Sequence, residues 1–568
     1  MDNREIANVF DEIADLLEIS GANFFRVRAY RNAARITRDH PVPLSSLTTE
    51  QLCELPGIGE ELAAKIETLS STGRLPFLDE LKKKVPSGLV ELRSIRGLGP
   101  KRIKLLGELL EVRDKEGLRR AAEAGRIRAV RGLGAKLEEQ ILHALAEPAA
   151  QQEKRMLYAD AEPIVNALLT HMRKCRAATA IDVAGSFRRR RETVGDIDVL
   201  AASSKPQSVT EQLRAYGPVK EVLASGETKT SVVLADGLQV DLRVVAPGDF
   251  GAALLYFTGS KAHGIHLRKI AQDRSLLLNE YGLFRGKKAI AAADEKGVYR
   301  ALGLEWIPPE IREDRGEIEA AASGKLPHLI ARKDLRGDLH SHSTWTDGRA
   351  SIEEMARGAA RAGLEYLAVT DHSKRLTMAH GLDPKRLREQ WREIDRVVAK
   401  VRGIKLLRGI EVDILEDGSL DLPDDVLSEL DWVVASVHYK IEQNSRDLTR
   451  RIVKAIGNPN VDVLGHPTGR LINHRAPGHF DLDEVLRAAR GEGCAMEINS
   501  QPERLDLDDV MCIAAKRAGV KMVISSDAHH PNQFAGLEYG VNQARRGWIE
   551  SSDVLNSRPL SKLRQRSR

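Results

Sequence analysis

The chain has 568 residues, of which 42% are hydrophobic and 30% charged, and its formal net charge is only +5. This length allows three or more domains with separate cores, and the composition is that of a globular protein. No run of eighteen apolar residues is present, and residues 1–10 lack the apolar core of a signal peptide. The four cysteines form no CxxC pair. We therefore expect a cytoplasmic protein with reduced thiols and no membrane contact.

The first 150 residues are expected to be helical. Apolar side chains recur at helical spacing over residues 6–17, and Pro and Gly then separate several short segments. Three of these segments share one pattern, with two glycines separated by one residue and followed by a helix: Leu55-Pro-Gly-Ile-Gly59, Ile95-Arg-Gly-Leu-Gly99 and Val130-Arg-Gly-Leu-Gly134. The repeat indicates one structural element used three times.

The repeated element resembles the helix-hairpin-helix motif. Two glycines let such a hairpin bring backbone N–H groups close to a phosphate, at the positive end of the next helix. Contacts of this kind position DNA without reading its bases. Residues 93–136 hold thirteen Lys or Arg against five Asp or Glu, although a solvated helix face would also explain that excess. The candidate DNA-binding residues here are Gly57, Gly59, Arg96, Gly97, Gly99, Arg131, Gly132 and Gly134.

Residues 1–84 also resemble the small amino-terminal domain of DNA polymerase beta, through Phe24-Phe-Arg-Val-Arg-Ala-Tyr-Arg31 and the first hairpin. In that family a lysine on the helix after the hairpin forms a Schiff base with a 5′-deoxyribose phosphate, and Lys65 matches it. Arg26 matches a 5′-phosphate contact. Glu61 departs from the pattern, because it stands where the family has a supporting lysine. The other interpretation of Lys65 is a solvated charge.

From about residue 180 the pattern changes to strands, and carboxylates gather on them. Asp196 and Asp198 are two residues apart on one strand, so both point to the same face and can share a pair of metal ions. Asp241, in another strand-like run, supplies a third carboxylate. Three like charges this close are unfavourable without cations. The sequence therefore predicts a catalytic site for Mg²⁺ or Mn²⁺.

Gly185-Ser186 followed by Gly195-Asp196-x-Asp198 resembles the signature of the nucleotidyltransferase superfamily. The resemblance implies that Asp241 acts on the side of the primer 3′-hydroxyl. It also implies that Ser186 and Arg189 bind the departing phosphates, with a backbone contact from Gly195. The four arginines at 188–191 likewise suggest a polyanion.

Tyr256-Phe-Thr-Gly-Ser260 resembles the nucleotide-pocket segment of the X family of DNA polymerases. In that family an aromatic pair, here Tyr256 and Phe257, packs against the sugar and excludes a ribose 2′-hydroxyl, and Gly259 lies in the same pocket. Two residues depart from the family. Gly264 stands where an asparagine contacts the nucleotide, and Lys261 replaces a residue that is acidic in polymerase beta.

After residue 333, strand-like runs alternate with helical ones, which favours a barrel of parallel strands and helices. The clearest strands are expected at 366–370, 432–436, 461–464 and 522–525. In such barrels, polar residues that follow a strand lie at the carboxyl-end face, where active sites are built. Candidate metal ligands follow nearly every strand.

His340-x-His342 places two imidazoles on one side of an extended segment, ready to share a metal. The whole ligand set resembles that of the PHP (polymerase and histidinol phosphatase) domain, and nine positions match: His340, His342, Asp347, His372, Glu411, His438, His466, Asp527 and His529. The resemblance implies up to three Mn²⁺ or Zn²⁺ ions and hydrolysis of a phosphoester. Nearby basic residues, including Arg349, Arg375 and Arg470, are candidates for holding a DNA backbone, or are plain surface charges.

The chain as a whole resembles a bacterial X-family DNA polymerase with a fused PHP domain. The expected fold class is multidomain, α+β and α/β, with a helical amino-terminal region, a nucleotidyltransferase-type palm with a thumb-like subdomain, and a βα barrel. The expected domains are a lyase-like DNA-binding domain (1–84), a fingers-like hairpin domain (85–150), the palm (151–245), the thumb-like subdomain (246–320), a linker (321–333) and the PHP domain (334–568).

The function that this resemblance implies is synthesis across short gaps in base excision repair. The substrates would be gapped or nicked DNA and deoxynucleoside triphosphates, and the enzyme would be a monomer. The PHP domain would add 3′→5′ exonuclease activity and incision at abasic sites. Two alternatives stay open: a barrel that acts as a small-molecule phosphatase, and a DNA-end-binding protein whose polymerase site has lapsed.

Overall fold

The computed structural model describes residues 1, 3–40, 42, 44–55, 57–85, 87–92, 95, 98–130, 132–146 and 155–563. The chain forms two compact units, Met1–Lys154 and Arg155–Arg568. Within the described residues no helix is both long enough and apolar enough to cross a membrane.

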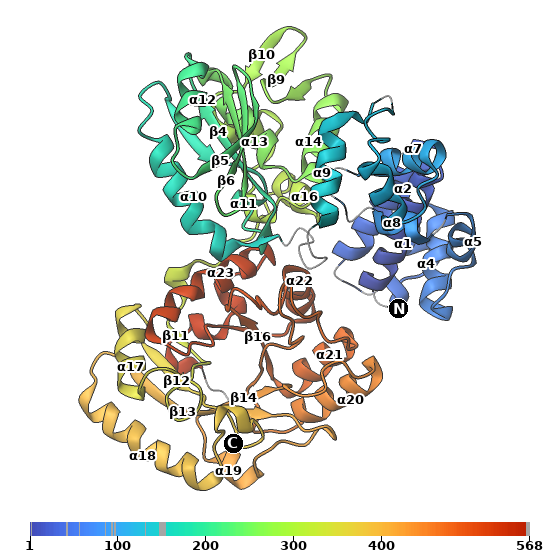
Figure 1. The fold of residues 1–568 in the computed structure, drawn as a ribbon. Coiled ribbons are helices and arrows are strands. Elements are labelled where there is room, and N and C mark those ends of the chain that lie inside the picture. Colours follow the sequence, from blue (N-terminus) through green and yellow to red (C-terminus); the bar gives the residue numbers. More distant parts are fainter. Residues whose placement is uncertain are drawn as a thin grey trace. The chain divides into compact units, whose positions relative to one another are not determined.

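The first unit is helical, as its sequence predicts (Figure 1, blue to cyan). Its helices are α1 (Asn3–Ile19), α2 (Phe24–Asp39), α3 (Thr49–Glu54), α4 (Glu60–Thr72), α5 (Pro76–Lys84), α6 (Ser87–Glu91), α7 (Pro100–Leu110), α8 (Lys115–Glu123) and α9 (Gly134–Ala146). The helical spacing of Ile6, Phe10 and Ile13 puts all three on one face of α1, where they are fully buried in a core shared with the other helices.

The second unit begins with a mixed sheet covered by helices. Its elements are β1 (Met156–Leu157), α10 (Tyr158–Met172), β2 (Ala180–Val183), α11 (Gly185–Arg188), β3 (Thr193–Val194), β4 (Asp196–Ala202), α12 (Pro206–Arg214), β5 (Val219–Ser225), β6 (Lys229–Leu234) and β7 (Gln239–Val245). The five-stranded sheet has the order β2-β4-β7-β6-β5, and its central pair β4 and β7 is parallel. This pair carries the three aspartates that the sequence singled out.

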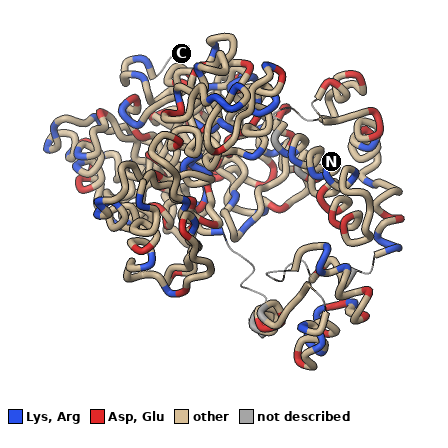
Figure 2. Tube along the Cα trace, turned by 90° about the horizontal axis from the view of Figure 1, so that it is seen from above, with Lys and Arg blue, Asp and Glu red and all other residues tan. Residues whose placement is uncertain are grey.

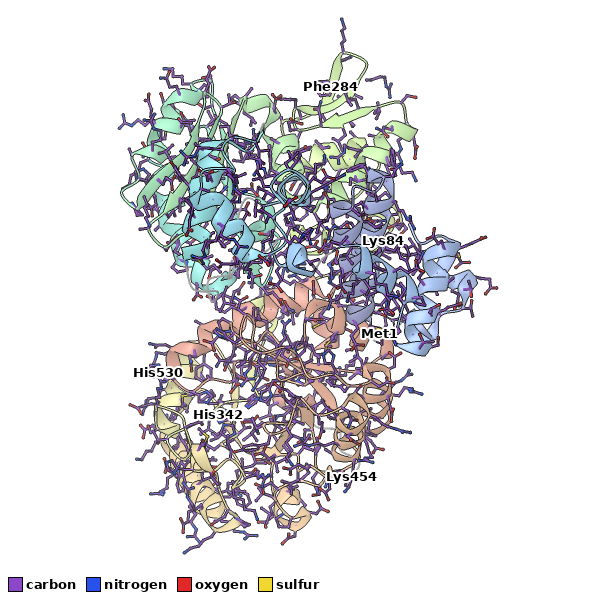
Figure 3. The ribbon with its side chains drawn as sticks, turned by 45° about the vertical axis from the view of Figure 1, so that its right-hand side comes forward. Met1, Lys84, Phe284, His342, Lys454 and His530 are labelled. Carbon is purple, nitrogen blue, oxygen red and sulfur yellow. The ribbon has the colours of Figure 1, made fainter. Side chains whose placement is uncertain are left out.

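A smaller group of elements follows the sheet. It comprises α13 (Phe250–Thr258), α14 (Lys261–Asp273), β8 (Leu277–Asn279), β9 (Gly282–Arg285), β10 (Lys288–Ala291), α15 (Glu295–Ala301) and α16 (Glu317–Ala322). Strands β8, β9 and β10 form their own antiparallel sheet, in which β9 and β10 are labelled in Figure 1 and Phe284 of β9 is labelled in Figure 3. The segment 321–333 that follows is packed rather than free, because Ile330 is fully buried and its N–H donates to the carbonyl of Ile549 at 2.9 Å.

The last part of the chain is a barrel of seven parallel strands. Strands and helices alternate in the order β11 (Gly337–Asp338), α17 (Ile352–Arg361), β12 (Tyr366–Val369), α18 (Pro384–Lys400), β13 (Lys405–Asp413), α19 (Asp424–Ser428), β14 (Trp432–Ser436), α20 (Ser445–Ile456), β15 (Val463–Leu464), α21 (Leu482–Glu492), β16 (Ala495–Asn499), α22 (Asp509–Ala518), β17 (Met522–Ser525) and α23 (Leu537–Arg546). The strands pair in sequence order, each parallel to the next.

The barrel closes between its first and last strands. Just beyond these strands, Ser341 and Ala528 form a parallel bridge, and His342 N–H donates to the Ala528 carbonyl at 2.8 Å. On the strands themselves the buried Asn556 amide fills the gap, donating to the carbonyls of Gly337 and Ile524 at 2.7 Å each. This architecture, with a helical region, a mixed sheet and a parallel barrel, confirms the expected fold class.

The mixed sheet and the barrel share one compact unit, and buried ion pairs join them. Arg546 of α23 donates to the Arg189 carbonyl at 2.9 Å, to Glu313 at 3.1 Å and to Asp509 at 2.5 Å. Arg470 donates to Glu192 at 2.7 Å. Elsewhere on this unit, acidic and basic residues are interspersed along the trace (Figure 2). Charged side chains therefore form part of the contact between sheet and barrel, beside the edge-on ring contact of Tyr158 with Tyr539.

Candidate functional site

The three aspartates of the mixed sheet lie on adjacent parallel strands. Asp196 and Asp198 are on β4, and Asp241 is on β7. The strand register pairs Asp198 with Asp241, so these two side chains are direct neighbours across the sheet. The spacing rule that predicts a shared face for Asp196 and Asp198 therefore extends to the third carboxylate.

The electrostatics of this group suit a divalent cation. Burial raises the pKa of Asp198 to about 6, and the charges of Asp196 and Asp241 add to the effect. Asp241 accepts hydrogen bonds from the Ser231 hydroxyl and, at 2.9 Å, from the Gln239 amide. A bound cation would relieve the repulsion between these carboxylates, and oxygen ligands of this kind are those that Mg²⁺ and Mn²⁺ prefer.

Gly185 lies directly against the Asp198 carboxylate. A Cβ at this position would come within 2.1 Å of Asp198 Oδ2, and the backbone φ of Gly185 is +60°. Only glycine fits this close approach without strain. Ser186 follows on α11 and is half-buried, while Gly195 is exposed, just before Asp196 on the chain. The structure thus brings Gly185 to the carboxylates, while Ser186 is the next residue after Gly185 and Gly195 is the residue before Asp196.

The run of arginines at 188–191 does not form the free basic surface that its sequence suggested. Arg188 donates to Glu295 at 2.8 Å, and Arg189 donates to Glu313 at 3.1 Å and to the Thr258 carbonyl at 2.5 Å.

The other two arginines of the run are also paired. Arg190 Nη1 lies 3.6 Å from Glu162, and Arg191 Nη1 lies 3.8 Å from Glu313. Acids distant in sequence therefore balance much of the charge of this run, and the interpretation as a polyanion site stays a prediction. Arg189 still lies close enough to Asp198 to oppose the rise in that carboxyl's pKa.

The segment that resembles a nucleotide pocket ends helix α13. Tyr256 is 44% exposed and Phe257 is half-buried, with their rings perpendicular and 5.1 Å apart. Gly259 follows at φ +70°, and a Cβ there would lie 3.1 Å from Arg189 Nη1. Gly264 has open space, because a Cβ there would meet only Arg268 Nη1, at 3.6 Å. The departure at Gly264 is therefore not imposed by packing.

The three glycine repeats form three turns of the same kind. In each turn a backbone N–H donates to the carbonyl three residues earlier, at 3.0 to 3.1 Å, in the pairs Ile58 to Leu55, Leu98 to Ile95 and Leu133 to Val130. Gly57 and Gly132 have φ of +90° and +95°, a conformation that glycine adopts freely.

The second glycine of each repeat lies at the start of a helix. Gly59 caps α4, Gly99 caps α7 and Gly134 begins α9, and a Cβ on any of them would meet nothing within 4 Å. The backbone at these helix ends is thus open to a phosphate. Arg96, Gly97 and Arg131 lie outside the described residues.

Lys65 lies on α4 in an aromatic and charged environment. Its ammonium is 5.1 Å from the ring centre of Phe77 and 5.4 Å from that of Tyr30, and Arg26 also lies over Phe77, at 5.0 Å. Lys65 forms an ion pair with Glu61, one turn earlier on the helix. The residue that departs from the family pattern is therefore the direct partner of the candidate lysine.

The barrel ligands gather at the carboxyl ends of the strands, in the interior, where His342 is labelled in Figure 3. Among the described residues, three groups place ligand atoms within 4.8 Å of one another: His342, Asp347, His372 and His529; His340, His342 and Asp527; and His372, Glu411 and His438. Eight of the nine matched positions belong to these groups. The ninth, His466, touches Glu411 instead, with Nε2 at 2.9 Å from Oε1.

These groups have the properties of cation sites. Several buried ligand atoms have no hydrogen-bond partner within the described residues, among them His340 Nε2, both ring nitrogens of His342 and Glu411 Oε2. Unpaired buried polar atoms are costly, so their convergence indicates a missing partner. Burial lowers the pKa of His372, but the charge of Glu411 outweighs it and raises that pKa to about 10. The negative charge of these carboxylates thus favours a positive charge beside them. A divalent cation fits the mixed imidazole and carboxylate set.

Two acidic residues that the sequence analysis did not identify orient the imidazoles. Glu497 of β16 accepts from His340 Nδ1 at 2.7 Å, and Asp413 of β13 accepts from His438 Nδ1 at 2.9 Å. Carboxylates in this position fix the tautomer and orientation of a metal-binding histidine. A signal exists in the sequence, since each is an acid within an apolar strand. The sequence analysis named no ligand on or after β16, and Glu497 lies on this strand.

The basic residues near the barrel ligands differ in their surroundings. Arg470 is buried against Glu192, and Arg375 pairs with Glu416 at 2.9 Å. Arg349 instead lines a cavity of about 700 Å³ whose wall includes the candidate ligands Asp347, Asp527 and His529. Figure 3 labels His530, another residue of this wall, nearer the edge of the barrel than His342.

Comparison with known families places four models along the chain. A helix-hairpin-helix domain matches residues 1–75, and a SAM-like helix-hairpin-helix tandem matches 89–147. A DNA polymerase beta thumb matches 253–313, and a PHP domain matches 338–526. These families imply DNA binding and dependence on divalent metal ions.

Comparison with individual proteins gives a relative that is similar along the full length. The DNA polymerase/3′-5′ exonuclease PolX of Bacillus subtilis (strain 168) is 39% identical over 564 residues, which cover 99% of this chain and 98% of that protein. The barrel alone also has relatives, such as a probable phosphatase of Thermoanaerobacter sp. (strain X514), 33% identical over 232 residues that cover 39% of this chain and 89% of that protein. The chain belongs to the family of bacterial X-family DNA polymerases that carry a carboxy-terminal PHP domain.

Proposed function

We propose that this chain is a DNA-directed DNA polymerase that fills short gaps during DNA repair, and that its barrel is a metal-dependent 3′→5′ exonuclease. The observation that carries the proposal is the presence of two separate ligand sets in one chain. One is the aspartate group of β4 and β7, and the other is the histidine-rich group inside the barrel. The relative from Bacillus subtilis, similar along its whole length, supports the same pair of activities.

In the polymerase site, Asp196, Asp198 and Asp241 would hold the Mg²⁺ or Mn²⁺ ions. When bound, such ions neutralise the charge that develops during in-line displacement at a phosphate. Asp241, fixed by Ser231 and Gln239, is proposed to face the primer 3′-hydroxyl.

The nucleotide would lie between the aspartates and helix α13. Tyr256 and Phe257 are proposed to pack against its sugar, with Gly259 leaving room for the backbone turn. Gly185, Ser186, Arg189 and Gly195 are proposed to surround the departing phosphates. The Arg189 guanidinium already has protein partners, so a phosphate would have to share it with Glu313 or Thr258.

In the barrel, the nine matched residues are proposed to hold up to three Mn²⁺ or Zn²⁺ ions. When bound, such ions activate water and stabilise charge at phosphorus. The chain's own contribution is to orient the ligands: Glu497 holds His340, Asp413 holds His438, and Glu411 lies within 3.7 Å of five different imidazoles. Incision at abasic sites would use the same centre.

The proposed partners are gapped or nicked DNA and deoxynucleoside triphosphates. The hairpin glycines at 57, 59, 97, 99, 132 and 134, together with Arg26, Arg96 and Arg131, are proposed to hold the DNA backbone. We propose that the protein acts as a monomer in the cytoplasm.

Lys65 is proposed as a Schiff-base lysine for a 5′-deoxyribose phosphate. The ion pair with Glu61 works against this role, because it favours the charged amine, whereas the nucleophile is the neutral one. Borohydride trapping on nicked abasic DNA tests it, with Lys65→Ala as the variant. An unchanged adduct in that variant removes Lys65 from the role.

Separate variants of the two sites test the whole proposal. Asp196→Ala is expected to abolish primer extension on gapped DNA and to leave degradation intact. The double variant His340→Ala, His342→Ala is expected to do the reverse. If either variant loses both activities while remaining folded, the two sites are not independent and the proposal fails.

A second candidate function is hydrolysis of a small phosphomonoester by the barrel. The similarity of residues in this region to probable phosphatases favours it. Turnover of histidinol phosphate compared with turnover of single-stranded DNA discriminates the two. Preference for the small substrate would replace the exonuclease proposal.

A further inference from the structure

Arg546 is a buried arginine of the barrel, and two of its partners belong to the polymerase part of the same compact unit. It lies on helix α23, and its side chain is only 2% exposed. Its guanidinium donates to the Arg189 carbonyl at 2.9 Å and to the Glu313 carboxylate at 3.1 Å. Within the barrel it donates to Asp509 at 2.5 Å. One side chain thus fastens two segments of the polymerase part to the barrel.

Arg189 is the residue on which this contact acts. Its Nε donates to Glu313 at 3.1 Å and its Nη1 donates to the Thr258 carbonyl. Within the described part of the chain no hydrogen bond to its Nη2 is found, so this nitrogen can bind a ligand. Guanidinium groups bind phosphate oxygens strongly. Arg189 is therefore anchored through two nitrogens and can offer the third to a phosphate.

Glu313 is shared between the two arginines. Its Oε1 accepts from Arg189 and from Arg546, at 3.1 Å each. Burial lowers the pKa of Arg189 and Glu313 raises it, while the charge of Arg546 lowers it again. Arg546 therefore counteracts the attraction of Glu313 for Arg189. Without Arg546 in this place, Glu313 would pair with Arg189 more fully and leave less positive charge for a phosphate.

Arg546 also holds the backbone of Arg189. The Arg189 carbonyl accepts the hydrogen bond from the barrel, and the Arg189 N–H donates to the carbonyl of Gly185 at 3.3 Å. Gly185 is the residue that lies directly against the Asp198 carboxylate. Displacement of such groups by about 1 Å has large effects on a reaction. A single barrel residue thus constrains both the main chain and the side chain of Arg189.

We propose that Arg546, a residue of the barrel, positions Arg189 for the phosphates of the incoming nucleotide in the polymerase site. Arg546 is a positioning residue, because it acts through Arg189 and not on the nucleotide itself. It holds the Arg189 backbone and keeps Glu313 from neutralising the guanidinium. This inference rests on the proposed polymerase function. It gives the barrel a part in nucleotide binding that is separate from its metal ligands.

The test compares Arg546→Lys with the wild type in single-turnover gap filling with Mg²⁺, over a range of nucleotide concentrations. Lysine keeps the positive charge but lacks the planar group that reaches several acceptors at once. We expect the apparent Kd for the nucleotide to rise about tenfold, because a charge-assisted contact is weakened. Extension at saturating nucleotide should stay within about threefold of the wild type, as expected when binding and not chemistry is affected.

Arg545→Lys is the matched control. Arg545 precedes Arg546 on the same helix, but it pairs with Glu310 at 2.9 Å and donates to the Ile330 carbonyl at 3.0 Å. Its substitution should leave the nucleotide Kd within about twofold of the wild type. The exonuclease activity of the same preparations monitors the fold of the barrel. It should also stay within about twofold in both variants.

Asp509→Asn is a second variant, which keeps the inference testable if Arg546→Lys does not fold. Asp509 holds Arg546 from within the barrel and also pairs with Arg315 at 3.1 Å. We expect the nucleotide Kd to rise by about threefold. The smaller effect follows because Arg546 keeps its acceptors at Arg189 and Glu313 and loses one partner only.

The outcomes separate the inference from the function on which it rests. A wild-type nucleotide Kd in both Arg546→Lys and Asp509→Asn would overturn the inference, as would an equal rise in Arg545→Lys. A parallel loss of extension and exonuclease activity with an unchanged Kd would also overturn it, because Arg546 would then only support the fold. If the wild type does not fill the gap with Mg²⁺, it is the proposed polymerase function that fails.

Discussion

Gly185 shows how a single residue supports the arrangement of the aspartates. Gly185 has no side chain and so leaves room for the Asp198 carboxylate. A Cβ on residue 185 would lie only 2.1 Å from Asp198 Oδ2. In Gly185→Ala we expect primer extension to fall about a hundredfold, because displacement of a catalytic group by about 1 Å has effects of that size. Pre-steady-state extension measures it.

The matched control for this change is Gly217→Ala, since a Cβ at Gly217 meets nothing within 4 Å. It should leave extension unchanged. The barrel's exonuclease should be equal in both variants. Extension at the wild-type rate in Gly185→Ala would mean that the Asp198 position is not critical.

Gly264 is a position at which a substitution is expected to strengthen nucleotide binding. The site has open space, so the asparagine common in the family can be accommodated. In Gly264→Asn we expect the KM for the incoming nucleotide to fall by about tenfold, the value of one hydrogen bond of ~1 kcal/mol or slightly more. Steady-state gap filling measures it, with Gly264→Ala as the control that adds no polar group. Equal KM values in the two variants would contradict a contact with the nucleotide.

Glu497 is expected to support metal binding in the barrel by orienting His340. It holds His340 at 2.7 Å and accepts from the His466 N–H at 2.5 Å. In Glu497→Gln we expect the barrel's metal affinity and exonuclease rate to fall about 10- to 100-fold, as for other partners of metal-binding histidines. Metal titration and strand degradation measure this, while Glu492→Gln, an exposed acid nearby in sequence, serves as control. Unaltered metal affinity in Glu497→Gln would show that His340 needs no such partner.

The sequence was informative at this scale where spacing dictates geometry. Asp196 and Asp198 share a face because they are two residues apart on a strand, and the structure places them so. Glu497 and Asp413 escaped notice because their function depends on which imidazole lies opposite, and that depends on the closed barrel. The partners of the four arginines escaped notice for the same reason.

At the scale of elements, alternating patterns predicted the longer strands well. The expected strands at 366–370, 432–436 and 522–525 correspond to β12, β14 and β17. The run at 461–464 gives only the two-residue strand β15, and the equally short β11 carried no strand pattern at all. Such strands are held by their neighbours rather than by their own sequence, so local patterns cannot reveal them.

Helix α23 and the segment before α16 form one part of the contact between sheet and barrel, and no local pattern predicts it. Its centre is Glu313, which accepts from Arg189 and Arg546 at 3.1 Å each. Burial raises the pKa of Glu313, but the charges of Arg546 and Arg189 outweigh it and lower that pKa to about 2. A carboxyl with a lowered pKa stabilises the fold at pH values above its unfolded pKa of about 4.5, and this contribution is lost as the pH falls towards 2.

We therefore expect Glu313→Gln to lower the free energy of unfolding by about 3 kcal/mol at pH 7, the order expected when a buried pair loses one partner. The difference from the wild type should shrink as the pH falls from about 4.5 towards 2. Urea unfolding at several pH values measures it. Glu305→Gln, at an exposed position, is the control and should have little effect. A constant difference across this pH range would show that the charge of Glu313 is not the cause.

At the scale of the whole molecule, the chain joins three kinds of structure with complementary chemistry. The helical unit offers three hairpin turns, the mixed sheet offers clustered carboxylates, and the barrel offers imidazoles with carboxylates. Hard carboxylate sites and mixed imidazole sites prefer different ions, so the two centres can be loaded and tested separately. The order of these parts along the chain was predictable, because each has a distinct signature. The charged contact between sheet and barrel was not.

The most direct test of the central claim is the metal content of the purified protein together with its gap-filling activity. The wild type, loaded with Mn²⁺ or Zn²⁺ and freed of excess ion, should retain up to three tightly bound ions per chain. The double variant His340→Ala, His342→Ala should lose them and still fill gaps when Mg²⁺ is supplied. Retention of the same metal content by that variant, or loss of gap filling in a folded protein, would contradict two independent metal centres.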